Sequence, residues 1–376
     1  MLDMPNSMIQ TCKRWLRTGI VALLLLSLSV GLSGAWWNGD NDKPKRESSL
    51  PAGNAITDGK ALLRYALPID NREVRKLQQS LEDIATRVRG KRWGSIAGDI
   101  KKASTILNLK ESKVLESVPP QRQAEAQEIL DQIKDGLVAL REAQEVQDGE
   151  KLLETRAQLL KKVSQLEELM VTGFPYEVPA EFANLPQLKG RATVEIQTNK
   201  GTMTMVADGY SAPVTAGNFI DLVERGFYDG LGFVPSEDYV LQVGDPPGKE
   251  VGFVDPETNE YRAIPLEILV RGDEEPTYHF TLEEIGRYRD QPVLPFSAYG
   301  TVALARPEAE ADGGSSQIFF FLFEPELTPA GLNLLDGRYG VFGYVVDGKE
   351  VLRQLKQGDV IESAKVIAGA ENLVKP

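Results

Sequence analysis

The stretch "GTMTMVADGYSAPVTAGNFIDLVERGFYDG", residues 201–230, decides the fold of the carboxy-terminal half of this chain. Just before it, polar and apolar residues alternate along "TVEIQT", residues 193–198, with the period of a strand. The turn residues "NKG" separate that run from the apolar run at 203–206, so the two runs predict a β-hairpin. A short helix is expected next, at about residues 213–225.

Three further motifs follow: "YVLQVGD" at residues 239–245, "GSSQIFFFL" at 314–322 and "LDGRYGVFGYVVDG" at 335–348. Around them, small strand-like runs separated by Gly and Pro continue to the end of the chain. So many strands have edges that must be hidden, and closing the sheet into a barrel hides them. We therefore expect residues 191–376 to form an antiparallel β-barrel domain.

Residues 56–172 have the hydrophobic period of helices instead, beginning with one long amphipathic helix at about residues 70–89. Pro119 and Pro120 mark a later helix start, because proline is tolerated in the first turn. The apolar residues of the four stripes are Val74, Leu77, Leu81, Ile84 and Val88, then Ile96, Ile100, Ile106 and Leu107, then Ile129, Ile133, Leu137 and Leu140, and finally Leu152, Leu159, Val163, Leu166 and Met170. Four antiparallel helices with short connections predict an up-and-down bundle. Packing in a core is the expected use of the stripes, and docking of a partner helix is the alternative.

The amino terminus predicts export. Residues 1–35 have three cations ahead of the apolar run "GIVALLLLSLSVGL" and small residues after it, which indicates a signal peptide cleaved after Ala35. An uncleaved anchor is the alternative, although the run is short for about 30 Å of hydrocarbon. Residues 36–55 are expected to be a flexible lead, and the three prolines of residues 173–190 favour a linker.

Charge and cysteine content narrow the chemistry. The only cysteine, Cys12, precedes the apolar run, so disulfides would play no part in the exported chain. Residues 36–190 contain 24 cationic and 24 anionic side chains, whereas residues 191–376 contain 15 and 30. An acidic barrel would repel phosphate backbones, which argues against nucleic acid as a partner. A basic or neutral protein segment fits better, and a merely soluble acidic surface is the alternative.

The four carboxy-terminal motifs, in their order along the chain, resemble the cyclophilin family over about half of the sequence. With the signal peptide and bundle in front, the whole chain is similar to the large thylakoid-lumen cyclophilins of oxygenic phototrophs. The resemblance implies a multidomain α and β protein: an N-terminal up-and-down helical bundle followed by a C-terminal antiparallel cyclophilin-like β-barrel. It also implies that residues near 246–297 are an insertion, which we expect to be partly helical.

Cyclophilins catalyse cis-trans rotation about bonds that precede proline, against a barrier of about 18 to 20 kcal/mol. The family's account is that a hydrophobic pocket holds the proline ring while an arginine donates a hydrogen bond to the prolyl nitrogen, which weakens amide resonance. Carried over position by position, the resemblance assigns a proline and peptide pocket to Tyr239, Val240, Gln242, Leu304, Ala305, Gln317, Phe319, Leu335 and Tyr339.

This chain departs from the family where the catalytic arginine belongs. In "GFVPSEDY", counting back from Tyr239 puts Val234 at that place, or Pro235 if one residue is deleted. Neither side chain donates a hydrogen bond, and loss of one preorganised donor typically costs about 10² to 10³ in rate. Arg306 is the candidate that could reach the pocket from another wall; a surface arginine paired with nearby glutamates is the alternative.

No cofactor is expected. The single histidine, His279, lies in the insertion, and one histidine with no cysteine cannot assemble a common zinc site. We therefore expect His279 to be structural or exposed, and we expect no metal site.

The class resemblance implies a role in assembly or maintenance of photosystem II. We expect an exported protein of a thylakoid lumen or a periplasm that binds proline-containing loops of client proteins with little or no turnover, and that reaches membranes only through those partners. An active prolyl isomerase and a structural subunit of a membrane complex are the alternatives.

Overall fold

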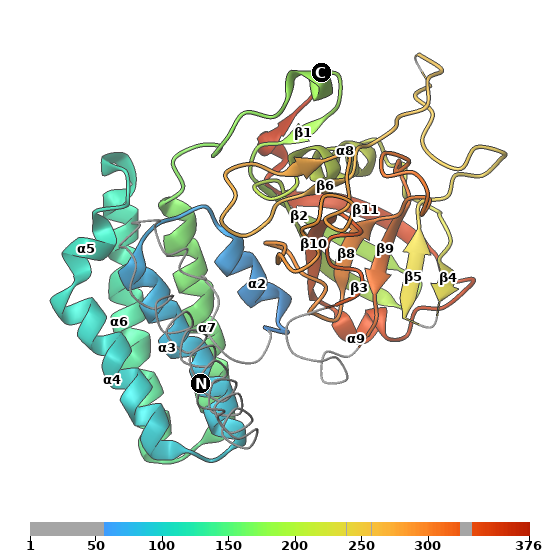
Figure 1. Ribbon diagram of the computed structural model, residues 1–376. Helices are drawn as coiled ribbons and strands as arrows, with labels where there is room; N and C mark the ends of the chain where they lie inside the picture. Colours follow the sequence, from blue (N-terminus) through green and yellow to red (C-terminus); the bar gives the residue numbers. More distant parts are fainter. Residues whose placement is uncertain (1–55, 238, 257, 324–332) are drawn as a thin grey trace, which may run out of the picture. The chain divides into compact units, whose positions relative to one another are not determined.

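The computed structural model describes residues 56–237, 239–256, 258–323 and 333–376. The predicted signal peptide and flexible lead lie outside these residues. The predicted bundle is present as four long helices: α3 (Arg72–Arg89), α4 (Trp93–Leu109), α6 (Gln123–Glu145) and α7 (Gly149–Leu169) (Figure 1). Within the described residues, no helix is both long and apolar enough to cross a membrane.

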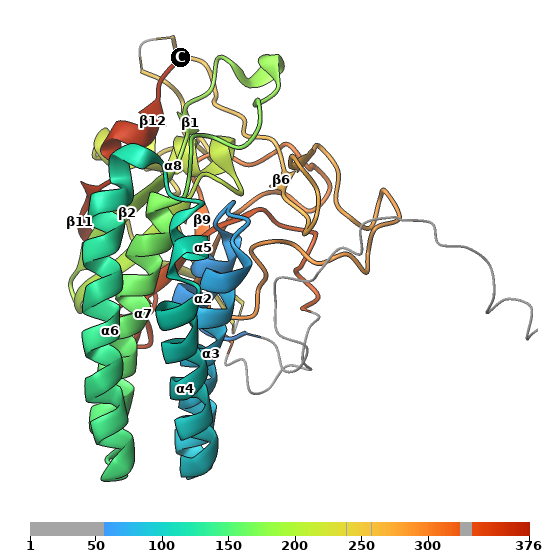
Figure 2. The same ribbon diagram turned by 90° about the vertical axis from the view of Figure 1, so that its left-hand side faces the viewer.

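The four helices close around one core. Helix α3 packs against α4 and α7, and α6 packs against the same two helices, so every apolar stripe has a partner (Figure 2). The apolar stripe residues from Val74 to Met170 are buried there, except the half-buried Val88. The short helices α5 (Glu111–Leu115) and η2 (Pro120–Arg122) turn the chain between α4 and α6. Asn71 fixes the start of α3, because its side chain accepts from the Val74 N–H at 3.0 Å and donates to the carbonyls of Lys113 and Val114.

The carboxy-terminal half is an antiparallel barrel of eight strands in the order β11-β2-β3-β10-β8-β9-β5-β4. The two edges meet at a bridge between Gly232 and Val360, next to a hydrogen bond from Phe233 N to Asp359 O of 2.8 Å. The eight strands are β2 (Arg191–Thr198), β3 (Gly201–Asp208), β4 (Val234–Glu237), β5 (Val240–Val243), β8 (Thr301–Leu304), β9 (Ile318–Phe321), β10 (Val341–Asp347) and β11 (Ile361–Ala368).

Helices and small sheets surround the barrel. Helix α8 (Pro213–Glu224), the short helix expected at 213–225, packs on β3, β10 and β11 (Figure 1). The remaining elements are η3 (Ala180–Phe182), β1 (Gln187–Leu188) paired with β12 (Leu373–Val374), β6 (Glu267–Ile268) paired with β7 (Thr277–Tyr278), α9 (Lys349–Leu352) and η5 (Ala370–Asn372).

One helix was not predicted from the sequence. Helix α2 (Gly59–Ala66) places Leu62, Leu63 and Ala66 in an apolar cluster with Phe296 and Tyr344 of the barrel half. The approach is close: a Cβ added to Gly59 would lie 2.8 Å from Cβ of Tyr344. Eight residues are too few to show a hydrophobic period with certainty, so only the tertiary contact reveals which face of α2 is buried.

The other face of α2 is tied to the bundle through charges. Arg64 of α2 pairs with Glu82 of α3 at 2.9 Å, and Arg75 of α3 pairs with the fully buried Glu167 of α7 at 3.1 Å. Burial raises the pKa of Glu167 to about 8, against the opposing effect of Arg75. A carboxyl without solvent is more stable in its neutral form unless its partner fully compensates.

The insertion differs from expectation. Residues 246–256 and 258–297 contain only the β6–β7 hairpin, bridges and turns, so the expectation of partial helix was wrong. The turn residues that follow Thr281 stop at Gly286, whose φ of 73° a right-handed helix cannot continue.

His279 is a structural residue, because its imidazole connects the insertion to two other segments of the chain. Its Nδ1 lies 2.7 Å from Oδ2 of Asp312, and its Nε2 lies 3.6 Å from Oε1 of Glu181 in η3. Partial burial lowers the pKa of His279, but the hydrogen bond and charge of Asp312, together with Glu181, outweigh it, so the net pKa is raised.

We predict that the stability of the protein falls as pH rises from about 4.5 to 8, because the unfolded chain loses the Glu167 proton in this window while the folded chain keeps it. Glu167→Gln should flatten the response, since it removes the titrating group and keeps the shape. Thermal unfolding midpoints of both proteins at pH 5, 6, 7 and 8 measure this. Identical slopes would show that Glu167 does not titrate with a raised pKa.

We also predict that His279, the only histidine, titrates above 6.5 in the folded protein. Its stabilising contribution is complete below the unfolded pKa and is lost as pH rises through the folded pKa. Its imidazole signal can be followed by NMR without assignment. Asp312→Asn should lower the pKa, because the burial remains while the carboxylate is gone; an unchanged value would refute the pairing.

Candidate functional site: a proline-binding face

The centre of the site is strand β9, which is buried on both faces. Ile318 and Phe320 point into the barrel core, whereas Phe319 and Phe321 belong to a second apolar cluster on the opposite face. Residues directly opposite each other on paired strands share a face. The register pairs Gln242 of β5 and Ala303 of β8 with Phe319, so the outer side of β9 brings these three residues together.

Phe319 is the predicted contact for the proline ring, and other aromatic rings surround it. It is only 4% exposed; the ring of Phe296 stacks on it at 5.9 Å and 6°, and the ring of Tyr339 meets it edge-on at 5.4 Å. Phe296 was not predicted from the sequence as a residue of this face. The uninterrupted apolar run at 318–322 is the available signal, because a strand without polar alternation is covered on both faces.

Most of the predicted pocket residues border this cluster. Half-buried side chains packed against it include Tyr239, Val240, Ala305, Leu335 and Tyr339. The side chain of Leu304 points into the barrel core instead. The peptide contact predicted for Leu304 is therefore one through its main chain.

The two predicted peptide-contacting amides are linked. Nε2 of Gln242 donates to Oε1 of Gln317, and Nε2 of Gln317 donates to the Val251 carbonyl at 2.6 Å and to Asp245 at 3.2 Å. This chain of hydrogen bonds fixes which end of each amide faces the site. Val251 and Asp245 anchor the network to the start of the insertion.

The strand register also shows where Val234 lies, the residue predicted to occupy the place of the family's arginine. Val234 lies directly opposite Gln242, and Pro235 lies opposite Leu241, whose side chain is in the barrel core. Val234 therefore lies on the same side of the sheet as Gln242, the predicted peptide-contacting amide, and it is 49% exposed. A valine side chain at that place can fill space and cannot donate a hydrogen bond.

Arg306 is near the pocket, but main-chain carbonyls hold its guanidinium. Nε and Nη2 donate to the Arg338 carbonyl at 3.1 and 2.7 Å, and Nη1 donates to the carbonyls of Pro307 and Glu308 at 2.9 and 3.1 Å. The partners are therefore backbone groups and not the glutamate carboxylates expected from the sequence. The described residues contain no group of three or more His, Cys, Asp or Glu side chains able to hold a metal.

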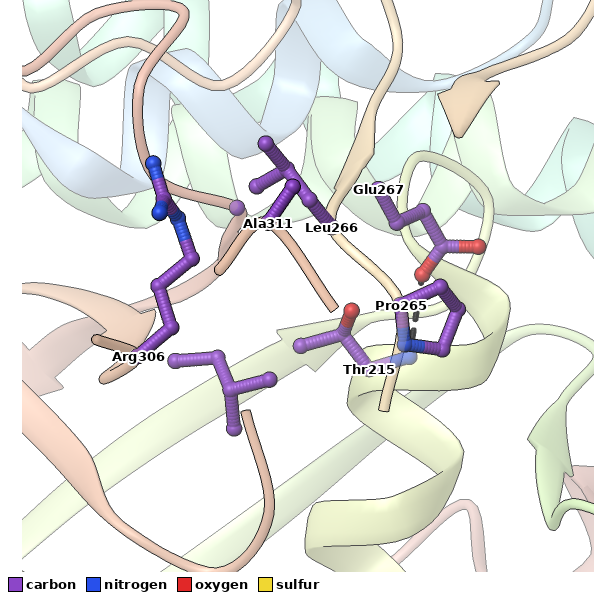
Figure 3. Close-up of a pocket in the computed structure, with 8 residues that line it drawn as sticks. Thr215, Pro265, Leu266, Glu267, Arg306 and Ala311 are labelled. Carbon is purple, nitrogen blue, oxygen red and sulfur yellow. Dashed lines mark hydrogen bonds between the residues drawn. The ribbon is translucent and has the colours of Figure 1, made fainter. Parts of the chain in front are cut away.

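A small pocket lies behind this segment, with Arg306 on one side and Thr215 and Glu267 on the other (Figure 3). Of the predicted site residues, only Leu304 and Arg306 line it. Glu267 caps α8, since its carboxylate accepts from Thr215 N at 2.9 Å and Tyr278 Oη at 2.8 Å. Burial raises the pKa of Glu267 to about 7 despite these bonds.

Comparison with known proteins agrees with this geometry. Residues 58–171 match the model of the CYP38-like peptidyl-prolyl cis-trans isomerase, PsbQ-like domain, and residues 193–371 match the model of cyclophilin-type peptidyl-prolyl cis-trans isomerases. A putative thylakoid lumen peptidyl-prolyl cis-trans isomerase of Synechocystis is 58% identical over 96% of both chains.

Two chloroplastic relatives from Arabidopsis thaliana are similar over most of this chain. The peptidyl-prolyl cis-trans isomerase CYP38 is 46% identical over 88% of this chain and 78% of its own, and CYP37 is 35% identical over 85% and 71%. With a barrel of the expected architecture, a bundle before it and these full-length similarities, the chain belongs to the cyclophilin-type peptidyl-prolyl cis-trans isomerase family, among its CYP38-like members.

Proposed function

We propose that this protein is a proline-binding chaperone that holds loops of client proteins during assembly or maintenance of photosystem II, with weak or absent isomerase activity. The observation that carries the proposal is the pairing of Val234 with Gln242. The groups that would hold a peptide surround Phe319, and the position beside the peptide-contacting amide carries no donor.

The relative stabilisation of the planar and rotated peptide bond explains why such a site binds a proline peptide without accelerating its isomerisation. A pocket for the ring and amides for the backbone stabilise the ground state and the rotated state about equally, which gives affinity without rate. Acceleration needs a donor that acts more strongly on the rotated imide nitrogen than on the planar one. Among the described residues at this face, Val234 cannot supply it, and Arg306 already donates to carbonyls.

The location and partners are part of the proposal. The predicted signal peptide and the relatives named as lumenal or chloroplastic proteins support a thylakoid lumen. The acidic barrel half favours client loops that contain Lys or Arg near their proline. Family membership favours ordinary prolyl isomerisation as the second candidate function, with Arg306 as its candidate donor.

The main test is a gain of function. Val234→Arg should raise the rate of isomerisation of a proline tetrapeptide by about 10² to 10³, because it restores one preorganised donor opposite Gln242. Val234→Leu is the matched control and should leave the rate unchanged. NMR exchange spectroscopy at micromolar protein measures both directions of rotation. Wild-type turnover equal to that of an ordinary cyclophilin would defeat the chaperone proposal in favour of the second candidate.

Client preference is tested with synthetic peptides from lumenal loops of photosystem II subunits. Each proline peptide should bind more tightly than its Pro→Ala match, and Lys-flanked versions should bind more tightly than Glu-flanked ones at low salt. The charge preference should fade as salt is raised. Equal affinity for proline and alanine peptides would contradict a proline-binding role.

A further inference from the structure

The structure assigns a positioning role to Arg306: its guanidinium fixes the two walls of the proline-binding face relative to each other. The inference rests on the proposed function of that face. One wall is the end of β8 at Leu304 and Ala305, and the other is the turn of residues 335–339 that precedes β10. Both walls contain predicted pocket residues, so the distance between the walls sets the spacing of those residues around Phe319.

One main-chain hydrogen bond joins these walls just before Arg306, and a second joins the first wall to the segment that enters β9. Leu304 N donates to Gly340 O at 3.1 Å, and Ala305 N donates to Gln317 O at 2.9 Å. Beyond Ala305 the chain leaves the sheet. The Arg306 side chain then continues the connection, since Nε and Nη2 both donate to the Arg338 carbonyl at 3.1 and 2.7 Å.

The same guanidinium also shapes its own loop. Nη1 donates to the carbonyl oxygens of Pro307, Glu308 and Glu310, at 2.9, 3.1 and 3.4 Å. Arg306 thus makes five hydrogen bonds to four carbonyls from two separate segments. A planar guanidinium with donors on three nitrogens can satisfy this geometry, whereas the single ammonium of lysine cannot.

The ring of Tyr339 connects Arg306 to Phe319, the predicted contact for proline. The guanidinium lies over the ring of Tyr339 at 5.1 Å from its centroid, and the Tyr339 ring meets Phe319 edge-on at 5.4 Å. The Tyr339 ring thus packs between the Arg306 guanidinium and Phe319. Displacement of the guanidinium therefore changes the wall that the proline ring would touch.

This role differs from that of a catalytic donor. The hydrogens of Nε and Nη1 and one of the two hydrogens of Nη2 are directed at carbonyls, so the backbone of the protein itself holds the guanidinium in place. It also differs from a surface ion pair, because the partners are carbonyl oxygens and not carboxylates. The effect of Arg306 on a bound proline passes through Tyr339 and the two walls.

The test compares Arg306→Lys with wild type in the chain that begins after the signal segment. The probe is an Ala-Ala-Pro-Phe tetrapeptide and its match with Ala in place of Pro, and the readout is the ratio of their two dissociation constants by calorimetry. Arg306→Lys should reduce the proline preference about tenfold or more, because small misplacement of binding groups has large effects. A merely structural role would instead lower the unfolding midpoint and leave the ratio unchanged.

Arg289→Lys is the matched control. Its guanidinium also lies over a tyrosine, Tyr288, at 5.5 Å, but both residues are exposed in the insertion. It should keep the wild-type ratio. Arg306→Gln, which retains a planar donor amide, is measured in case Arg306→Lys does not fold. Its ratio of dissociation constants should lie between those of wild type and Arg306→Lys.

The outcomes separate the two proposals. A wild-type preference for proline that both Arg306 variants retain would overturn the positioning role and leave the proposed function standing. A wild-type protein with no preference would remove the proposed function and the positioning role together. Loss of preference in the Arg306 variants at an unchanged unfolding midpoint, with Arg289→Lys like wild type, supports the positioning role.

Discussion

The burial of β9 on both faces is the constraint on which the site depends. A closed barrel normally covers only its inner face, yet Phe319 and Phe321 carry large aromatic surface on the outer side. That surface is covered by Phe296 and by side chains of neighbouring strands and of α2. The same apolar area stabilises this side of the barrel, and it leaves the ring of Phe319, the predicted contact for a proline, only 4% exposed in this structure.

Binding a peptide and accelerating its isomerisation require different groups. Apolar rings and paired amides line one face, which suits affinity for an extended segment. The guanidinium of Arg306, which lies over the Tyr339 ring, donates to main-chain carbonyls of the protein itself. A site of this kind is well preorganised, because its walls are fixed before any ligand arrives.

Three titrating groups lie at contacts between separate segments of the chain, and their pKa values shift in the same direction. Glu167 lies where α3 meets α7, Glu267 caps α8 from the insertion, and His279 joins the insertion to η3 and Asp312. The pKa of each group is raised, by burial for the two glutamates and by the neighbouring carboxylates for the histidine. All three contacts are therefore more stable in mildly acidic solution than at higher pH.

The sequence by itself determined the order of the two halves, the four bundle helices and the hairpin at 193–206. Local periodicity and motif order carry that information, because each depends on neighbours along the chain. Only the tertiary structure decided that Phe296 stacks on Phe319, that α2 covers the barrel, and that Arg306 binds carbonyls instead of glutamate side chains. Those contacts join segments far apart in sequence, where no local pattern specifies the partner, and the register that sets Val234 opposite Gln242 depends on which strands pair.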